Sequence, residues 1–488
     1  MQTTTAAPPL TTTQTLSFGI GQIAEGVKTS VFGTFLLFYY NQVLGLAADL
    51  AGLAIALALI FDAITDPMAG SISDRWRSRL GRRHPFIYVS AVPFGLAFYF
   101  TFAPPEALLA AGQTALFVWM LAGTVLVRGS MTLYYVPHMA LGAELSEDYD
   151  ERTVLVATRH FFGALGFVLV FMLGFGYYFS PSPEFPNGQT NPDAYPPFML
   201  LVAIIASSAI LITARGTQSR IPWLPQPRVD QPRVRAIDVI TEAYSSLSNS
   251  SFRWMLSGFI IIIVVFGVAG ATGLYLGTFF WKLNQFQILL TALAGPVGSM
   301  LGYMLSGRFF RWLDKRNAMI AGGAAWMTIH SAPILLYLAG WMPEPGSWPL
   351  AIVLTLGTTL AGACIGQLIV GSHTTMADIA DEQELATDLR QEGVFFGASA
   401  FATKCSGALG SWIAGLVLVA IDWPVGQAIR TAEDIPLETM ISLAIIAGPV
   451  SAVLAIPGLL CLRGYRLNRQ RLAEIQAILR ENRLVRSS

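Results

Sequence analysis

The chain has 488 residues, of which 54% are hydrophobic and only 12% are charged, and its formal net charge is zero. The charged share is about half of that usual in soluble domains, so the chain cannot cover a water-facing surface. Composition therefore excludes a soluble globular protein, and a neutral chain of this kind gives no reason to expect a nucleic-acid partner.

Segments of about 20 apolar residues recur along the chain, which is the length that crosses a hydrocarbon core about 30 Å thick. We predict twelve membrane-spanning helices and hence an all-α membrane protein. Their approximate ranges are 16–45, 50–72, 85–104, 113–142, 154–180, 196–214, 254–281, 286–308, 317–340, 348–372, 391–420 and 437–462. The opening MQTTTAAPPLTTTQ lacks the pattern of a removable signal peptide, so we expect the first span to stay in the mature protein.

Lys and Arg gather in alternate loops, which indicates the orientation of the chain. The basic loops are 75–83, 215–253, 308–316 and the tail 463–486, whereas loops 105–112, 181–195 and 341–347 contain neither residue. By the positive-inside rule, we expect both termini in the cytoplasm of a multi-pass protein of the cell (inner) membrane.

Two patterns repeat on either side of the long polar connection at 215–253. GSISDRWRSRLGRR, which starts at Gly70, has a weaker echo in GYMLSGRFFRWLDKR, which starts at Gly302. AEL followed by FFGA, starting at Ala143, recurs as ADI followed by FFGA, starting at Ala377. Both repeats have an offset of about 230 residues, which predicts two pseudo-symmetric six-helix halves with a substrate site between them.

The repeat divides the chain into four parts. We expect an N-terminal half at 1–214, a cytoplasmic linker at 215–253, a C-terminal half at 254–463 and a basic cytoplasmic tail at 464–488. The tail is predicted to be an amphipathic helix on the anionic membrane surface.

Ionisable side chains at membrane depth are costly and are functional candidates by default. They are Glu25, Lys28, Asp62, Asp66, Arg128, His138, Arg159 and Lys404. At a rise of 1.5 Å per residue, Glu25, Asp62 and Lys404 lie about 14 to 20 Å from the starts of their helices, near the middle of the bilayer.

Asp62 and Asp66 are four residues apart and therefore share one helix face. Two acids so close repel each other, so at least one must be protonated unless a cation lies between them. Thr65 and a hydroxyl of the fourth helix, such as Thr132, can complete an oxygen shell. The pattern favours a Na⁺ or H⁺ site, and the alternative is a salt bridge to a basic residue of another helix. Pro67 is expected to kink this helix and free carbonyls, or is an ordinary transmembrane proline.

The other membrane charges leave alternatives open. Glu25 and Lys28, three residues apart, either neutralise each other or contact the substrate. Arg128 either pairs with an acid or binds substrate, and His138 is expected to be an interior histidine rather than a proton relay. Lys404 has no acid within a turn, which favours coupling or substrate binding over a structural role.

Acidic residues cluster before the fifth and eleventh spans, beside the matched basic loops. They are Glu144, Asp148, Asp150 and Glu151, and Asp378, Asp381, Glu382 and Glu384. The match predicts cytoplasmic salt bridges that hold one state closed, and the alternative is solvated loop charge.

Two stretches carry a resemblance to a known family. FDAITDPMAGSISDRWRSRLGRRHPF, at 61–86, resembles the helix 2 signature of the glycoside-pentoside-hexuronide:cation symporters, the melibiose permease group of the major facilitator superfamily. MADIADEQELATDLRQEGVFFGASAFATK, at 376–404, resembles the helix 10 to 11 segment of the same family. The resemblance implies the major facilitator fold and alternating-access symport of a sugar, glycoside or sugar acid with Na⁺ or H⁺. No other cofactor is implied.

The resemblance also implies roles for individual residues. Asp62 and Asp66 match the acids that bind the coupling cation, with Thr65 and Thr132 beside them. Expected substrate or coupling residues are Lys404, Arg159, Arg128, Tyr135, Glu25, Gln22 and His138. The loop after the second helix resembles the gating loop of the superfamily, with Asp74, Arg75, Arg79 and Arg82.

Departures from the family pattern affect the sugar site. Gly26 and Tyr135 stand where the family has sugar-binding aspartates, and Met139 stands where it has a stacking tryptophan. The cation machinery therefore looks retained and the substrate pocket rebuilt, which leaves transport of an amphiphile such as a lysolipid as an alternative. We expect no enzyme, because HExxH, GxSxG and HxxxD groupings are absent at membrane level. Nothing in the sequence demands more than a monomer.

Overall fold

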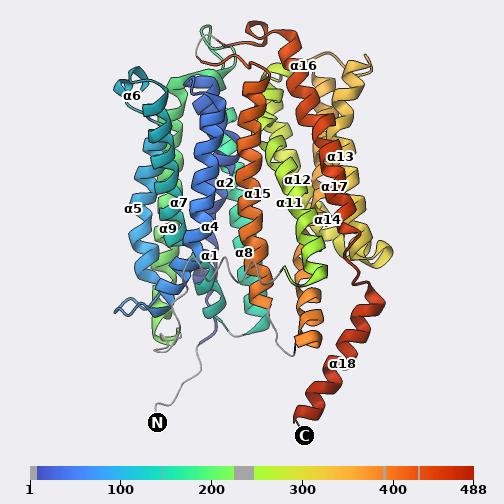
Figure 1. Ribbon diagram of the computed structural model, residues 1–488. Coiled ribbons are helices and arrows are strands. Elements are labelled where there is room, and N and C mark those ends of the chain that lie inside the picture. Colours follow the sequence, from blue (N-terminus) through green and yellow to red (C-terminus); the bar gives the residue numbers. More distant parts are fainter. Residues whose placement is uncertain (1–7, 147, 225–246, 388–391, 427–428, 488) are drawn as a thin grey trace. The chain divides into compact units, whose positions relative to one another are not determined.

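The computed structural model describes residues 8–146, 148–224, 247–387, 392–426 and 429–487, and within these ranges no β-strand occurs. The chain forms two compact units (Figure 1). The first comprises Met1–Ala236 with Pro424–Arg430, and the second comprises Ile237–Trp423 with Thr431–Ser488.

The first predicted span, 16–45, is helical with irregular hydrogen bonding at Gly21 and Phe35, both of which keep right-handed helical backbone angles. It consists of α1 (Thr12–Ile20), α2 (Gln22–Thr34), the short α3 (Leu36–Phe38) and a π-helical turn, η1 (Tyr39–Val43). At the first irregularity, the Gly21 amide donates to the Thr213 hydroxyl at 3.0 Å. A side chain at Gly21 would meet this hydroxyl and that of Tyr134, so the close approach of neighbouring helices accompanies the irregularity.

The remaining helices of the first unit are long and pack in a regular order. They are α4 (Ala48–Arg75), α5 (His84–Thr101), α6 (Glu106–Ala110), α7 (Gln113–Glu144), α8 (Tyr149–Leu173) with η2 (Gly174–Tyr178), and α9 (Tyr195–Thr217). Short 3-10 turns are η3 (Gly188–Thr190), η4 (Pro192–Ala194) and η5 (Gln218–Trp223). Helices α4 and α5 pack on α7, α2 packs on α8, and α5 packs on α9.

The second unit repeats this arrangement. Its elements are α11 (Ser250–Tyr275) with η6 (Leu276–Phe280), α12 (Gln285–Leu313), α13 (Lys315–Leu338), α14 (Trp348–Thr387), α15 (Glu392–Ala420), η7 (Ala432–Asp434), α16 (Leu437–Ile445) with η8 (Ile446–Val450), α17 (Ser451–Leu462) and α18 (Arg469–Ser487). Helices α12 and α13 pack on α14, and α11 packs on α15. The second and third spans of each unit therefore pack on the fourth, and the first packs on the fifth.

The repeat extends to the backbone at the end of the first span of each unit. Both spans end in a π-helical turn, η1 and η6. The Leu46 amide then bonds a carbonyl six residues back at 2.8 Å, and the Leu283 amide does the same at 2.9 Å. Gly45 and Lys282, one residue earlier, both have positive φ, at 78° and 51°. The two halves therefore share a turn whose conformation is independent of the side chain present.

Ten helices in the described part of the chain are long and apolar enough to cross a membrane. The two further predicted spans are the irregular first span and α5, which has 18 residues. The number and length of these apolar helices are those of an integral, multi-pass membrane protein.

Two predictions about the second unit need correction. The acids at 378–384 do not lie in a loop, because α14 continues through them to Thr387. The tail helix α18 packs on α14, with Ile475 only 1% exposed, and the Gln476 amide donates to Asp381 at 3.0 Å. One apolar face of α18, with Ile475 and Leu479, is therefore covered by the second unit.

The connection before α18 is also anchored in the second unit. The Tyr465 hydroxyl donates to Asp378 at 3.2 Å, and Tyr465 is fully buried. Burial, and then the charge of Asp378, raises the pKa of Tyr465 well above its ordinary value. Tyr465 is therefore a neutral hydrogen-bond donor that fixes the start of the tail.

Candidate functional site

Asp62 and Asp66 of α4 meet one hydroxyl of α7. Thr132 Oγ1 lies 2.9 Å from Asp62 Oδ1 and 2.8 Å from Asp66 Oδ1. Asp62 and Thr132 are buried, with 7% and 3% of their surface exposed. Because a hydroxyl carries a single proton, it cannot donate fully to both carboxylates at once. The helix spacing and the α4–α7 packing thus bring two acids and one bridging oxygen together, as the sequence predicts.

Arg128 lies one turn before Thr132 on α7 and contacts the same pair. Its Nη1 donates to Asp62 Oδ2 at 3.3 Å, and this is an ion pair between two buried side chains. The ring of Phe32, from α2, lies 5.6 Å from the guanidinium carbon. Of the two alternatives left open for Arg128, the structure has the pairing with an acid.

Thr65, the polar residue between the two acids, contacts the backbone of its own helix. The Thr65 hydroxyl bonds the Asp62 backbone carbonyl at 3.4 Å, a weak contact within its own helix. Helix α4 continues through Pro67, which has no amide to donate to the Ala63 carbonyl. Within the described residues, no three His, Cys, Asp or Glu side chains gather as a metal cluster.

Glu25 and Lys28 of α2 neutralise each other. Lys28 Nζ lies 2.9 Å from Glu25 Oε2, and the Thr29 hydroxyl donates to Glu25 at 3.0 Å. Both charged side chains are largely buried. Tyr135 of α7 is half-buried, and Gln22 Oε1 is buried without a hydrogen-bond partner among the described residues.

Arg159 and His138 have different surroundings. Arg159 of α8 is half-buried and donates to the Met139 sulfur at 2.7 Å. His138 is fully buried between the rings of Phe18 and Tyr134, at centroid distances of 4.5 and 5.0 Å. His138 thus lies in the interior, but it is not a satisfied histidine, because both of its ring nitrogens are buried without a hydrogen-bond partner among the described residues.

Gly26, where the family pattern has an aspartate, lies at a helix contact. A side chain there would collide with the Gly163 carbonyl of α8, which is a backbone atom. A side chain at Gly163 would in turn come within 2.9 Å of Gln22. Helices α2 and α8 therefore approach through small residues, and no acidic side chain fits at Gly26 in this arrangement.

The loop after α4 forms an ion-pair cluster. Its centre is Arg83, which was not among the predicted gating residues. Arg83 contacts Asp74 at 2.5 Å and Glu144 at 2.7 Å, and Arg82 contacts Glu144 at 2.8 Å. Arg83 is 4% exposed, whereas Arg79 is exposed. Arg75 is half-buried.

The equivalent cluster in the second unit pairs Lys315 with Asp378 at 2.6 Å. The repeat aligns Lys315 with Arg83 and Asp378 with Glu144. A base and an acid at matching positions of both halves could have identified Arg83 from the sequence. Two of the other acids that precede the fifth span make local hydrogen bonds. Asp148 caps α8 and Glu151 accepts from the Leu10 amide.

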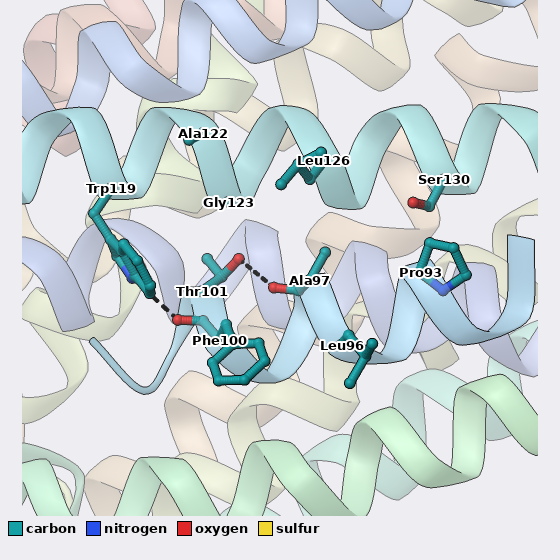
Figure 2. Close-up of a pocket in the computed structure, with 10 residues that line it drawn as sticks. All are labelled: Pro93, Leu96, Ala97, Phe100, Thr101, Trp119, Ala122, Gly123, Leu126 and Ser130. Carbon is teal, nitrogen blue, oxygen red and sulfur yellow. Dashed lines mark hydrogen bonds between the residues drawn. The ribbon is translucent and has the colours of Figure 1, made fainter. Parts of the chain in front are cut away.

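An apolar hollow of about 370 Å³ lies between α5 and α7 (Figure 2). Its two hydroxyl-bearing residues are Thr101, which donates to the Ala97 carbonyl at 2.6 Å, and Ser130. At about 3.6 residues per turn, Trp119, Leu126 and Ser130 lie on the opposite face of α7 from Arg128 and Thr132. The hollow is therefore separate from the carboxylate pair, and its exposed Leu126 suits contact with lipid tails.

Comparison with known proteins identifies the family. The family model described as MFS/sugar transport protein matches residues 17–469. The chain belongs to this family. It is thus a membrane transporter of the major facilitator superfamily, and not an enzyme.

Relatives of this major facilitator transporter are distant but span its length. An uncharacterized symporter of Synechocystis sp. is 24% identical and covers 96% of both chains. The isoprimeverose transporter of Lactiplantibacillus pentosus is 24% identical over 83% of this chain and 79% of its own. A glucuronide carrier protein homolog of Escherichia coli is 23% identical over 86% of both.

Solved structures share the fold of this transporter. A nucleoside transporter mutant has a TM-score of 0.64 at 12% identity, covering 92% of this chain and 98% of its own. The xylose transporter of E. coli, partially occluded and inward open, has a TM-score of 0.58 at 15% identity, covering 94% and 98%. These likenesses confirm the major facilitator fold.

Lys404, the predicted coupling lysine of this family member, lies on α15 in the second unit and is half-buried. The carboxylate pair belongs to the first unit. The approach of Lys404 to the cation site stays a prediction.

Proposed function

We propose that this transporter is a symporter that carries a sugar, glycoside or sugar acid together with Na⁺ or H⁺. The carboxylate pair bridged by Thr132 is the observation that supports a coupling cation, because two acids so close are relieved by a positive charge between them. Oxygen ligands are those that hard cations prefer, and the pair supplies them within a buried setting. The names of relatives support a sugar or glucuronide as solute.

The balance of charge favours a sugar acid over a neutral sugar. The membrane-embedded part of the first unit carries three acids and three bases, which are Glu25, Asp62 and Asp66, and Lys28, Arg128 and Arg159. Binding of one monovalent cation leaves this region with an excess positive charge. A solute carboxylate restores neutrality, which lowers the electrostatic cost of crossing.

The orientation and organisation follow the basic loops. We place both termini at the cytoplasmic side of the cell (inner) membrane, with the ion-pair cluster of Arg82, Arg83 and Glu144 at the cytoplasmic end of the first unit. The linker expected at 215–253 is assigned to the same side from its basic residues alone, since 225–246 lie outside the described residues. The chain is proposed to act as a monomer. The apolar hollow between α5 and α7 gives the lysolipid alternative no support, because it lies away from the carboxylate pair.

The test is uptake into proteoliposomes driven by an imposed Na⁺ or H⁺ gradient, after a thermal-shift screen of sugars and sugar acids with and without sodium. Asp66→Asn is expected to abolish uphill accumulation while the purified protein keeps its melting temperature within a few degrees. Accumulation by Asp66→Asn equal to that of the wild type contradicts the cation-site assignment.

A further inference from the structure

Arg128 is a buried guanidinium with few partners. It is 7% exposed, and among the described residues its one hydrogen bond runs from Nη1 to Asp62 at 3.3 Å. Its Nε is buried without a partner there. A guanidinium has several donors, and its pairs with carboxylates are commonly two-pronged and shorter, near 2.7–2.9 Å. The contact with Asp62 is therefore one-pronged and long, so it leaves most of the binding capacity of Arg128 unused.

Arg128 forms an ion pair with Asp62, which is also a proposed ligand of the cation. Asp62 presents Oδ1 to Thr132 and Oδ2 to Arg128. A cation bound between Asp62 and Asp66 has a charge of the same sign as the guanidinium of Arg128. Both bind the carboxylate of Asp62. Each therefore weakens binding of the other by direct repulsion.

We propose that Arg128 is a displaceable competitor at the cation site. It holds Asp62 when the site is empty, and a bound cation, taken as sodium, releases it. The freed guanidinium then binds the carboxylate of a sugar acid. The inference rests on the cation-coupled transport proposed above and names both the substrate class and the residue that links the two ligands.

The neighbouring groups direct the released guanidinium toward the solute. A buried cation that loses its partner needs another anion. Glu25 is already engaged by Lys28 and Thr29, so it does not compete strongly for this role. The Phe32 ring covers one face of the guanidinium, which keeps its donor edge available for a two-pronged contact with a carboxylate. Sodium and the sugar acid then strengthen each other's binding by the same factor.

Sodium affinity of the purified full-length protein tests the competition without any solute. The melting temperature is followed as NaCl replaces choline chloride at constant ionic strength. Arg128→Gln removes the competitor, so sodium binding is expected to tighten by about tenfold or more. Arg128→Lys keeps the positive charge on a shorter side chain that reaches Asp62 less well, so it is expected to give an intermediate affinity, which also covers the case in which Arg128→Gln fails to fold. Arg253→Gln, on an exposed arginine, is the matched control.

A sodium affinity that falls in Arg128→Gln or Arg128→Lys overturns the inference, because it makes Arg128 a supporting residue of the site. A wild type insensitive to sodium overturns it as well. Neither result overturns symport, which gradient-driven uptake decides separately.

The link to the solute is tested with D-glucuronate against D-glucose as probes. In the wild type, sodium is expected to tighten glucuronate binding several-fold and to leave glucose binding unchanged. In Arg128→Gln the sodium effect on glucuronate is expected to vanish although sodium still binds. A sodium effect of equal size in the variant, or none in a wild type that binds sodium, overturns the assignment of the sugar acid to Arg128.

Discussion

Thr132 is the residue on which the two carboxylates converge. Its hydroxyl donates its proton toward the carboxylates and still offers lone pairs to a bound cation. Removing the oxygen therefore removes a proposed cation ligand together with a hydrogen bond to a charged group, which contributes about 1.5–3 kcal/mol.

Thr132→Val, which keeps the shape of the side chain, is expected to weaken sodium binding about tenfold or more. Thr132→Ser restores the hydroxyl and is expected to stay within about twofold of the wild type, since the same ligand returns. Titration of the melting temperature with sodium compares the three proteins. An unchanged sodium affinity in Thr132→Val contradicts the place of this hydroxyl in the site.

At this scale, sequence spacing predicts which residues share a helix face but not how faces meet. The four-residue spacing of Asp62 and Asp66 and the family resemblance together point to Thr132, and the structure brings the three side chains together. The pairing of Arg128 with Asp62 depends on the rotation of α7 against α4, which spacing along one helix cannot fix. The salt bridge that was the alternative therefore forms at a carboxylate of the proposed cation site.

At the scale of elements, α2 and α8 approach each other closely through small residues at Gly26 and Gly163. Gly26 stands where the family resemblance has an acid, and the backbone of Gly163 fills the space that a side chain needs. Close helix contacts through small residues are a main source of packing energy in membranes, because lipid tails are as apolar as the helices.

Gly26→Ala is expected to destabilise the protein by about 1–3 kcal/mol, because the added methyl meets backbone atoms that cannot turn away. Gly33→Ala is the matched control on the same helix, where nothing lies within 4 Å of the added atom. It is expected to be neutral or stabilising by up to about 1 kcal/mol, since alanine favours the helix. Thermal melts in detergent measure both, and equal melting temperatures contradict the tight contact.

Hydropathy predicts where most spans lie, but it misplaces interruptions and helix ends that depend on contacts with other helices. It gives α7, α12 and α13 within a few residues, because their apolar stretches end where the helices end. It misses the irregularity at Gly21, which packing against Thr213 sets, and it ends the tenth span early. Helix α14 continues through polar residues because Asp378 finds Lys315 and Tyr465.

At the scale of the whole molecule, each unit carries its own ion-pair cluster at equivalent positions of the repeat. Arg83 with Glu144 and Lys315 with Asp378 are the equivalent pairs of the repeat. Each cluster joins elements of one unit, and the two share no partner among the described residues. The repeat thus explains why the basic and acidic motifs recur, before any role in gating is considered.

The independence of the clusters predicts additivity. Glu144→Gln and Asp378→Asn are each expected to cost about 1.5–3 kcal/mol of stability, because the first removes the charged acceptor that Arg82 and Arg83 share and the second removes that of Lys315. The double variant is expected to equal the sum within about 0.5 kcal/mol. Glu474→Gln, in the exposed pair with Arg471, is the control and is expected to cost less than about 1 kcal/mol.

Thermal melts of the four variants measure these energies, and uptake measures function in parallel. A double variant that departs from the sum by more than about 1 kcal/mol contradicts independence. It means that the clusters act on one shared equilibrium, which is what salt bridges that close the cytoplasmic side of a rocking transporter must do. Additive stability with normal uptake assigns the clusters to holding each half together, so that gating must then rest on other contacts.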